Sequence, residues 1–430
     1  MDHVKGAART CKRTWPAIGG GLVLATFTGF RAIAGVSALP PSLGDGDTYD
    51  LYVGGDEQYD DNLFRVPSAV GSVGSLVNPN ASRADRVSSV SAGGDGQWIL
   101  GRQVFNVDLH ADQNWFARNS FLNNTSGNAK LVWNWQVGGY FSGTAGATYS
   151  HALVSFGEAL YLGRDLLNST AYFGTARYQV GPHWALYGGV GDSSVAHSAA
   201  AAQTGNFRTQ GGNAGIEYAL DVADTLSVEY RYDQGRFRAG QLETVIVNSQ
   251  PVTLSPDFHD DTVLFTLKHS FSDKTQLVAD AGYLKRFYPN TSVGSFSGDI
   301  WRATLNWQPS DKTQLAFAAW RELHAYLESQ SNYFVSTGGS VKPTWFATDK
   351  ITVSVQYAYE KQSYIQTSTS VVNLGPLNAN VGVESANLNY SPRDNWILGL
   401  AYVHVNRASS AESFRYGDNL ATFSVLYKTR

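Results

Sequence analysis

Alternation of apolar and polar residues with a period of two runs through nearly the whole chain, and it constrains the fold more than any other feature. Trp301, Leu305 and Trp307 occupy odd positions of one such stretch, whereas the even positions between them are polar. Another stretch carries Val228 and Tyr230 between polar neighbours. Successive side chains of a β-strand point to opposite faces, so each stretch predicts a strand with one apolar and one polar face.

Short polar clusters separate these stretches at intervals of about 40 residues. The clusters are residues 94–96, 138–139, 181–183, 221–224, 272–274, 309–312, 348–350 and 391–394. Two alternating stretches and a longer polar loop lie between consecutive clusters. The longer loops are predicted at residues 67–83, 117–127, 154–167, 240–256 and 367–380. The chain is therefore expected to form about 18 antiparallel strands, starting near Thr48, with both ends on the periplasmic side of a closed barrel.

Composition favours a membrane barrel over a soluble β-sandwich or propeller, the alternative that alternation alone leaves open. The chain is 13% aromatic and only 16% charged, with a mean hydropathy of −0.22. Beyond the N-terminus it has no run of about 18 apolar residues that could form a spanning helix. Aromatic residues gather near strand ends, where a membrane-interface girdle would lie. They include Trp184, Trp307, Tyr390, Trp396 and Tyr427.

The first 38 residues read as a cleaved signal peptide, with an N-terminal membrane anchor as the alternative. Basic residues precede an apolar stretch from Ala17 to Phe30, and small residues end at Ala38. The expected organisation is a signal peptide over 1–38, a short periplasmic segment over 39–47 and a barrel over 48–430. Removal of the signal would also remove Cys11, the single cysteine, so no disulfide or Cys-ligated metal is expected.

Charged residues on the polar faces of the strands are predicted to line an aqueous lumen. An Arg or Lys facing lipid at the midplane would cost about 2–4 kcal/mol. The lumen-facing candidates are Arg102, Asp108, Arg177, Glu217, Glu229, Arg231, Asp280, Arg286, Arg302 and Glu360. These groups could pair across the lumen and stiffen it, or they could form a polar track for a sugar chain. Neither sign of charge dominates, so the pattern leaves both interpretations open.

Candidate catalytic and metal-binding groups are sparse. Asp108, His110 and Asp112 share one face of a predicted strand, where a solvated wall is favoured over a metal or acid–base cluster. His259 with Asp260 and Asp261 is expected in a loop as a turn cap. Asp56, Asp60 and Asp61 lack the ligand spacing of a calcium loop. No nucleophile-elbow, zinc-protease or phosphate-loop motif appears, so we predict no enzyme, metal or cofactor.

Three segments resemble a known family of outer-membrane proteins. They are Asp60-Asp61-Asn62-Leu63-Phe64-Arg65 with the preceding Tyr59, residues 101–108 and residues 133–143. Together they are similar to the EpsL family, exosortase-associated barrels of exopolysaccharide biosynthesis and export loci. The same Asp-Asn-Leu-Phe segment also occurs in other β-barrel porin families. The resemblance implies an outer-membrane channel that guides a polysaccharide through a polar lumen, working with periplasmic or inner-membrane export components.

The alternative function is a general or substrate-selective diffusion porin; a structural or adhesive barrel and an enzyme are weaker alternatives. Membrane lipid and lipopolysaccharide are expected partners, and an acidic net charge of −4 gives no reason to expect nucleic acid. Phe423, Val425 and Tyr427 on one face of the last strand resemble the segment that the barrel-assembly machinery recognises. The chain is therefore expected in the bacterial outer membrane.

Overall fold

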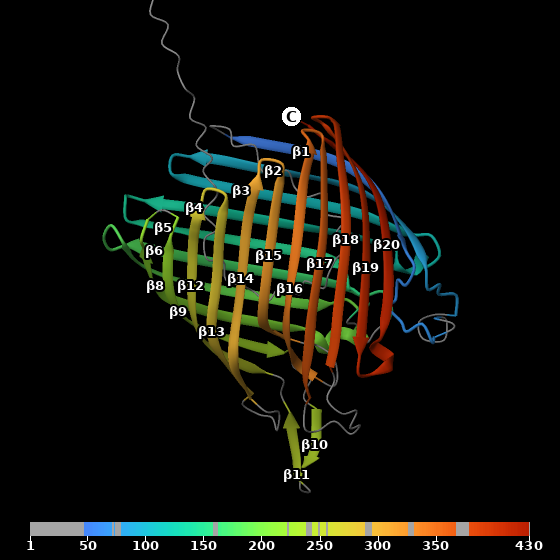
Figure 1. Ribbon diagram of the computed structural model, residues 1–430. Coiled ribbons are helices and arrows are strands. Elements are labelled where there is room, and N and C mark those ends of the chain that lie inside the picture. Colours follow the sequence, from blue (N-terminus) through green and yellow to red (C-terminus); the bar gives the residue numbers. More distant parts are fainter. Residues whose placement is uncertain are drawn as a thin grey trace, which may run out of the picture.

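The computed structural model is a closed all-β barrel (Figure 1). It describes residues 47–70, 73, 79–157, 162–221, 223–237, 243–247, 250–254, 257–288, 295–325, 331–366 and 378–429. The barrel strands are β1 (Thr48–Asp60), β2 (Asp85–Leu100), β3 (Gln103–Phe116), β4 (Asn124–Val137), β5 (Phe141–Leu153), β6 (Leu166–Gln179), β7 (Trp184–His197), β8 (Phe207–Ala219), β9 (Thr225–Phe237), β12 (Phe258–Ser272), β13 (Thr275–Phe287), β14 (Phe296–Ser310), β15 (Thr313–Ala325), β16 (Ser331–Thr348), β17 (Ile351–Gln366), β18 (Asn378–Arg393), β19 (Trp396–Ser409) and β20 (Tyr416–Lys428).

Each strand pairs antiparallel with its neighbour in the chain, and β1 closes the ring by pairing with both β2 and β20. The resulting sheet has 18 strands, which confirms the predicted fold and strand number. A separate hairpin, β10 (Glu243–Val247) and β11 (Gln250–Leu254), lies beyond the ends of the barrel strands (Figure 1). Short 3-10 turns occupy Ser120–Leu122 (η2), Ala200–Gly205 (η3) and Glu412–Phe414 (η4). Among the described residues, no helix has the length and apolar character to span a membrane.

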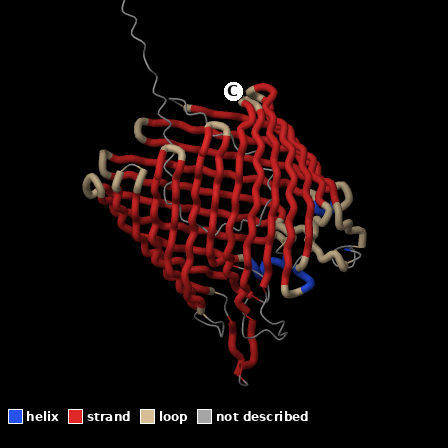
Figure 2. The backbone as a smooth tube through the Cα atoms, viewed as in Figure 1, coloured by secondary structure: helices blue, strands red, loops and turns tan. Residues whose placement is uncertain are grey.

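Short turns connect the strands at one end of the barrel, and longer connections join them at the other (Figure 2). Gly101 and Gly138 adopt φ of +62° in the turns after β2 and β4, a left-handed conformation that glycine adopts without strain. The described chain ends, near Thr48 and Lys428, lie at the short-turn end. In outer-membrane barrels the short turns are periplasmic and the long loops extracellular, and we use these names for the two ends.

The predicted turn at residues 94–96 is wrong, because this glycine-rich run lies inside β2 and the turn follows at Gly101. Glycine serves a different purpose there: a side chain at Gly93 would collide with the ring of Tyr52 on the neighbouring strand. The other predicted turns agree with the structure to within a few residues. The predicted signal peptide, residues 1–38, lies outside the described residues.

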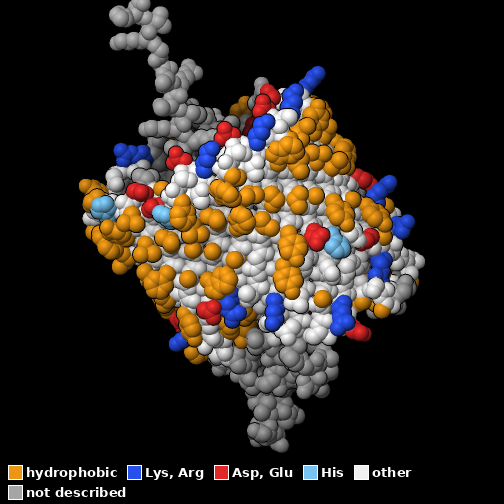
Figure 3. Space-filling model, in the orientation of Figure 1, with side chains coloured by type: hydrophobic (Ala, Val, Ile, Leu, Met, Phe, Trp, Pro, Cys, Tyr) orange, Lys and Arg blue, Asp and Glu red, His pale blue; other side chains and the backbone are white. Residues whose placement is uncertain are grey.

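Apolar side chains are spread over the face of the barrel seen in Figure 3, and charged side chains lie mostly toward its two ends. Tryptophans such as Trp98, Trp184 and Trp396 are exposed on the outer surface near the periplasmic turns. Tyrosines such as Tyr149 and Tyr359 are exposed on it in the extracellular half. Aromatic girdles of this kind sit at the two interfaces of a bilayer. A closed barrel leaves no unpaired strand edge in the lipid, so this architecture is that of an outer-membrane protein.

Candidate functional site

The lumen wall carries most of the charged residues predicted to face it. Four of them are next in sequence to an apolar or aromatic residue that is exposed on the outer surface of the same strand: Arg177, Glu217, Glu229 and Glu360. Side chains alternate between the two faces of a strand, so these charges point inward. The same alternation places inward Asp108 on β3, Arg231 on β9, Asp280 and Arg286 on β13, and Arg302 on β14.

Arg102 differs from the rest of this set. It lies in the two-residue turn between β2 and β3, where its guanidinium donates to the backbone oxygen of Gly138 in the next periplasmic turn. The residue therefore does not line the barrel wall. With the turn predicted at residues 94–96, Arg102 would lie inside the following strand. The turn instead follows β2, which ends at Leu100, and β3 begins only at Gln103.

The inward arginines form close ion pairs with carboxylates on the same wall. The guanidinium nitrogen to carboxylate oxygen distances are 2.7 Å for Arg177–Glu217, 2.7 Å for Arg231–Glu229, 2.6 Å for Arg286–Asp260 and 2.7 Å for Arg302–Glu322. Glu360 instead accepts hydrogen bonds from Ser336 and Gln362, both at 2.6 Å. In each ion pair the two charges neutralise each other, and the contact holds both long side chains against the wall.

The arc formed by β1, β2 and β3 is rich in carboxylates. Asp95 and Asp108 are directly paired across β2 and β3, and Asp112 lies further along β3 on the same face. His110 contacts Tyr52 Oη through Nδ1 at 2.9 Å and Asp112 Oδ1 through Nε2 at 2.8 Å. Asp108, His110 and Asp112 thus share one face, as predicted. Their contacts are those of a polar, hydrogen-bonded wall.

His259, Asp260 and Asp261 lie within β12, so the prediction that they form a turn cap is wrong. The three side chains alternate between faces. Asp260 pairs with Arg286 inside the barrel, whereas His259 stacks on Phe287 outside, with ring centroids 5.1 Å apart. Asp261 accepts a hydrogen bond from Tyr230 on the outer face. A polar run can continue a strand here because this part of β12 is close to the extracellular rim.

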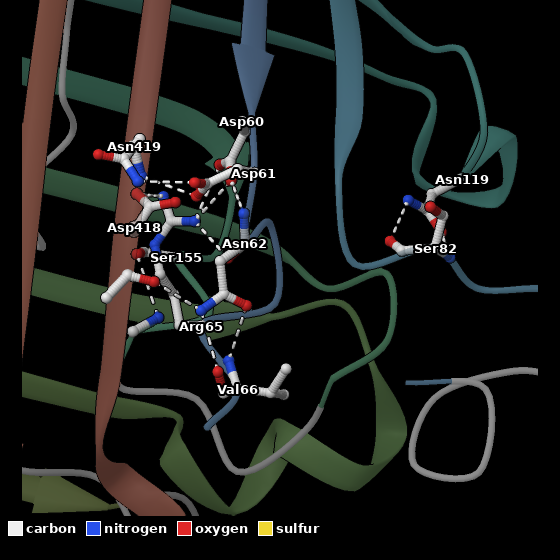
Figure 4. A network of polar contacts seen from close by, with 12 residues as sticks. Asp60, Asp61, Asn62, Arg65, Val66, Ser82, Asn119, Ser155, Asp418 and Asn419 are labelled. Carbon is white, nitrogen blue, oxygen red and sulfur yellow. Dashed lines mark hydrogen bonds and ion pairs between the residues drawn. The ribbon is translucent and has the colours of Figure 1, made fainter. Parts of the chain in front are cut away.

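An arginine-centred network secures the first extracellular loop to the wall (Figure 4). Arg65 Nη1 donates to Asp60 at 2.8 Å, and Arg65 Nη2 lies 3.0 Å from Asp418 Oδ2. Burial alone would lower the pKa of Arg65, but the neighbouring Asp60 and Asp418 raise it above its usual value. Asn62 adds hydrogen bonds of 2.9 Å to the backbone oxygens of Val66 and of Gly417 on β20. The segment from Asp60 to Arg65, recognised in the sequence as a motif, therefore positions a loop.

Three carboxylates of this network, Asp60, Asp61 and Asp418, have oxygens within 4.8 Å of one another, a grouping that could hold a metal ion. The positive charge among them is supplied by Arg65, which contacts both Asp60 and Asp418. Asp61 is held separately, because Asn419 donates to it through its backbone and its side chain at 2.8 and 2.6 Å. The donor set therefore fits an internal cation, the guanidinium.

Apolar side chains from three extracellular connections pack together beside this network. Phe64 is fully buried, at 0% exposure, and its ring centroid lies 4.9 Å from that of Phe156 and 6.5 Å from that of Phe121. The cluster also contains the inward residues Val87 and Phe116 of the wall. Burying a side chain such as Phe64 contributes about 1.5–3 kcal/mol. The loops are thus packed onto the inner wall at the extracellular mouth.

We call the described parts of the connection between β5 and β6, residues 154–157 and 162–165, the crossing segment; they extend this packing toward β19. β5 is separated from β19 around the ring by β1–β4 and β20. Nevertheless Gly157, just after β5, accepts a hydrogen bond of 3.0 Å from Arg407 Nη1 on β19. A side chain at Gly157 would come within 2.9 Å of Tyr416 Oη, so the close approach needs glycine. The crossing segment narrows the mouth, a role that the sequence did not reveal.

The far end of the crossing segment is fixed by Asp165. Its carboxylate contacts His197 Nδ1 at 2.6 Å and accepts hydrogen bonds from the backbone of Ala199 at 2.9 Å and from Ser198 at 3.3 Å. Burial by itself would raise the pKa of Asp165, but these hydrogen bonds outweigh it and hold the pKa below its usual value. Asp165 therefore binds the crossing segment to the connection after β7.

Comparison with known proteins gives one family match. The family described as "Putative beta-barrel porin 2" matches residues 268–429, from within β12 to the end of β20. No curated protein matches the chain. Similar solved structures include the Pseudomonas aeruginosa outer membrane protein OpdK, with 11% identity, 89% of this chain and 98% of that chain covered and a TM-score of 0.45. Another is P. aeruginosa OccK2 (OpdF) in complex with glucuronate, with 9% identity, coverage of 89% and 98% and a TM-score of 0.46. The chain is thus a porin-like β-barrel of the bacterial outer membrane.

Proposed function

We propose that the protein is a substrate-selective diffusion channel for small hydrophilic solutes. The crossing segment carries this proposal, because Gly157 is bound to Arg407 on β19, with β1–β4 and β20 between that strand and β5, and Phe156 packs on Phe64. A barrel of this strand number can enclose an aqueous passage, and a fixed segment across its mouth limits what can enter. Small solutes fit such an aperture better than a polymer.

The inward charged residues supply the proposed selectivity. The wall arginines are matched by carboxylates, whereas Asp56, Asp95, Asp108 and Asp112 share the arc of β1–β3. An excess of carboxylates in a narrow aqueous path attracts cations and repels anions. We therefore expect cationic solutes to pass more readily than anionic solutes of the same size.

The polysaccharide-export role implied by the sequence resemblance remains a prediction of the sequence alone. The matched family is described as a porin family, which favours the diffusion channel. A sugar polymer would also have to pass the contact between Gly157 and Arg407. Channel activity, without catalysis, accounts for a wall of paired charges.

Single-channel recording in planar bilayers tests the proposal. Replacing residues 155–164 by a short Gly-Ser linker should raise the unitary conductance, because it removes the barrier at the mouth. The same linker in place of residues 243–254 should leave the conductance unchanged, since that hairpin lies beyond the barrel (Figure 1). The reversal potential in a salt gradient should report cation preference. Equal conductance of wild type and the first variant would contradict the proposal.

A further inference from the structure

The outer face of the barrel carries polar side chains that neither the channel nor the apolar surface explains. On β19, Tyr402 and His404 face outward, since inward Val403 and Val405 pack with the inward valines of β18. Their partner Asn419 lies on the outer face of β20. In the view of Figure 3, acidic and histidine side chains lie side by side within the apolar outer surface. Polar groups facing hydrocarbon are costly, and within this cluster they hydrogen-bond to one another.

The hydrogen bonds of this cluster orient its histidine. Asn419 Nδ2 donates to Asp61 Oδ2 at 2.6 Å, and a carboxylate at this distance can only accept, so Asn419 Oδ1 faces the other way. Tyr402 Oη donates to that oxygen at 2.7 Å, and His404 Nδ1 lies 2.9 Å from it. Nδ1 of His404 is then the donor to Asn419 Oδ1. Its Nε2 has no hydrogen-bond partner among the described residues.

The same arrangement recurs between β5 and β6. Tyr149 Oη donates to Asn168 Oδ1 at 3.0 Å, and His151 Nδ1 lies 2.7 Å from the same oxygen. In both clusters the tyrosine and histidine are two residues apart on one strand, and the asparagine is on the next strand. Tyr149 and Tyr402 are similarly exposed, at 44% and 47%. β1–β4 lie between the two clusters around the ring.

We propose that these two clusters bind the saccharide headgroup of a glycolipid in the outer leaflet, lipopolysaccharide. Their histidines, His151 and His404, lie in the extracellular half of β5 and β19, the side on which headgroups of the outer leaflet meet the barrel. An exposed tyrosine ring offers an apolar face to a sugar ring. The adjacent histidine Nε2 accepts a hydrogen bond from a sugar hydroxyl. Two like arrangements on separate arcs suit a ligand that surrounds the barrel, whereas a contact between copies of the chain would use a single patch or two complementary ones.

Native mass spectrometry of the full chain, refolded in detergent without lipid and titrated with purified lipopolysaccharide, tests this proposal. Wild type should retain two lipopolysaccharide molecules. His404→Phe and His151→Phe should each retain one, and the double variant none, because phenylalanine keeps the ring but removes the acceptor. His259→Phe is the matched control: this histidine is also on the outer face but stacks on Phe287 without a Tyr–Asn partner pair. It should retain two.

Two further arms separate the ligand from other occupants. Phosphatidylethanolamine, which has no sugar, should not compete, and soluble core oligosaccharide should compete weakly. Retention of two lipopolysaccharide molecules by the double variant would overturn the proposal, as would equal retention of phosphatidylethanolamine. So would association of wild-type chains that the double variant abolishes without any loss of lipid. Channel conductance should be unchanged in the double variant, so failure here would be distinct from failure of the proposed function.

Discussion

Removal of Arg65 should strongly destabilise the folded barrel. The residue lies between Asp60 and Asp418, whose side chains are 1% and 0% exposed, and both would lose their counter-charge in Arg65→Ala. Removing one partner of a buried ion pair costs about 3–5 kcal/mol. We expect a loss of this size in the free energy of unfolding, measured by urea titration in lipid vesicles.

Arg86→Ala is the control for Arg65, because Arg86 pairs with Glu57 but is 67% exposed. Exposed pairs contribute at most about 1 kcal/mol. Similar losses for the two variants would show that the network around Arg65 is not a buried anchor.

Asp165 should make stability depend on pH at the acidic end. Its pKa in the folded protein is lowered by hydrogen bonds from His197, Ala199 and Ser198, which outweigh burial. A lowered folded-state pKa adds stability that is present above the unfolded value of about 3.9 and is lost as pH falls through the folded value. The free energy of unfolding of wild type should therefore fall below about pH 4 more steeply than that of Asp165→Asn. Parallel curves for the two proteins would contradict this assignment.

At the scale of the strand, the face decides what a substitution costs. Leu131 is exposed on the outer face near the middle of β4, and Val132 points into the lumen. Leu131→Arg should destabilise the folded barrel by about 2–4 kcal/mol, because it places a cation in lipid. Val132→Arg, one residue away, should cost much less, since its side chain reaches water. Urea unfolding of both variants in vesicles checks the difference. Equal losses in the free energy of unfolding would contradict the assignment of the two residues to opposite faces.

The sequence predicts elements such as β4 and β14 well, because a period of two is a local property of the chain. Trp301 and Arg302 lie on opposite faces as their alternation predicted. The crossing segment could not be predicted, because its path depends on contacts between residues far apart in the chain. Gly157 and Arg407 are 250 positions apart. The apolar residues of this connection, among them Phe156 and Leu162, which both join the cluster around Phe64, were the local signal available.

Polar runs misled the prediction where a strand approaches the extracellular rim. His259, Asp260 and Asp261 look like a turn because no apolar residue interrupts them. In the barrel the inner face accommodates polar side chains and the outer face is polar near the headgroups, so such a run continues β12. Lumen-facing charges can be predicted from the sequence where their strand keeps an apolar outer face. In β9, for example, Tyr230 is exposed on the outer face between Glu229 and Arg231.

For the molecule as a whole, the ring of 18 strands supplies an aqueous path, and the mouth loops restrict it. The paired arginines and carboxylates hold the wall in shape, while the anchors at Arg65 and Asp165 hold the loops. We therefore expect a channel with a size limit set at the extracellular mouth.

Osmotic swelling of liposomes that contain the purified barrel tests this central claim most directly. Monosaccharides and disaccharides should enter at rates well above those of protein-free liposomes, and the rate should fall steeply with increasing solute size. Replacing residues 155–164 by the Gly-Ser linker should shift that limit to larger oligosaccharides. Absence of swelling with monosaccharides, or equal passage of small sugars and long polysaccharides, would contradict the account.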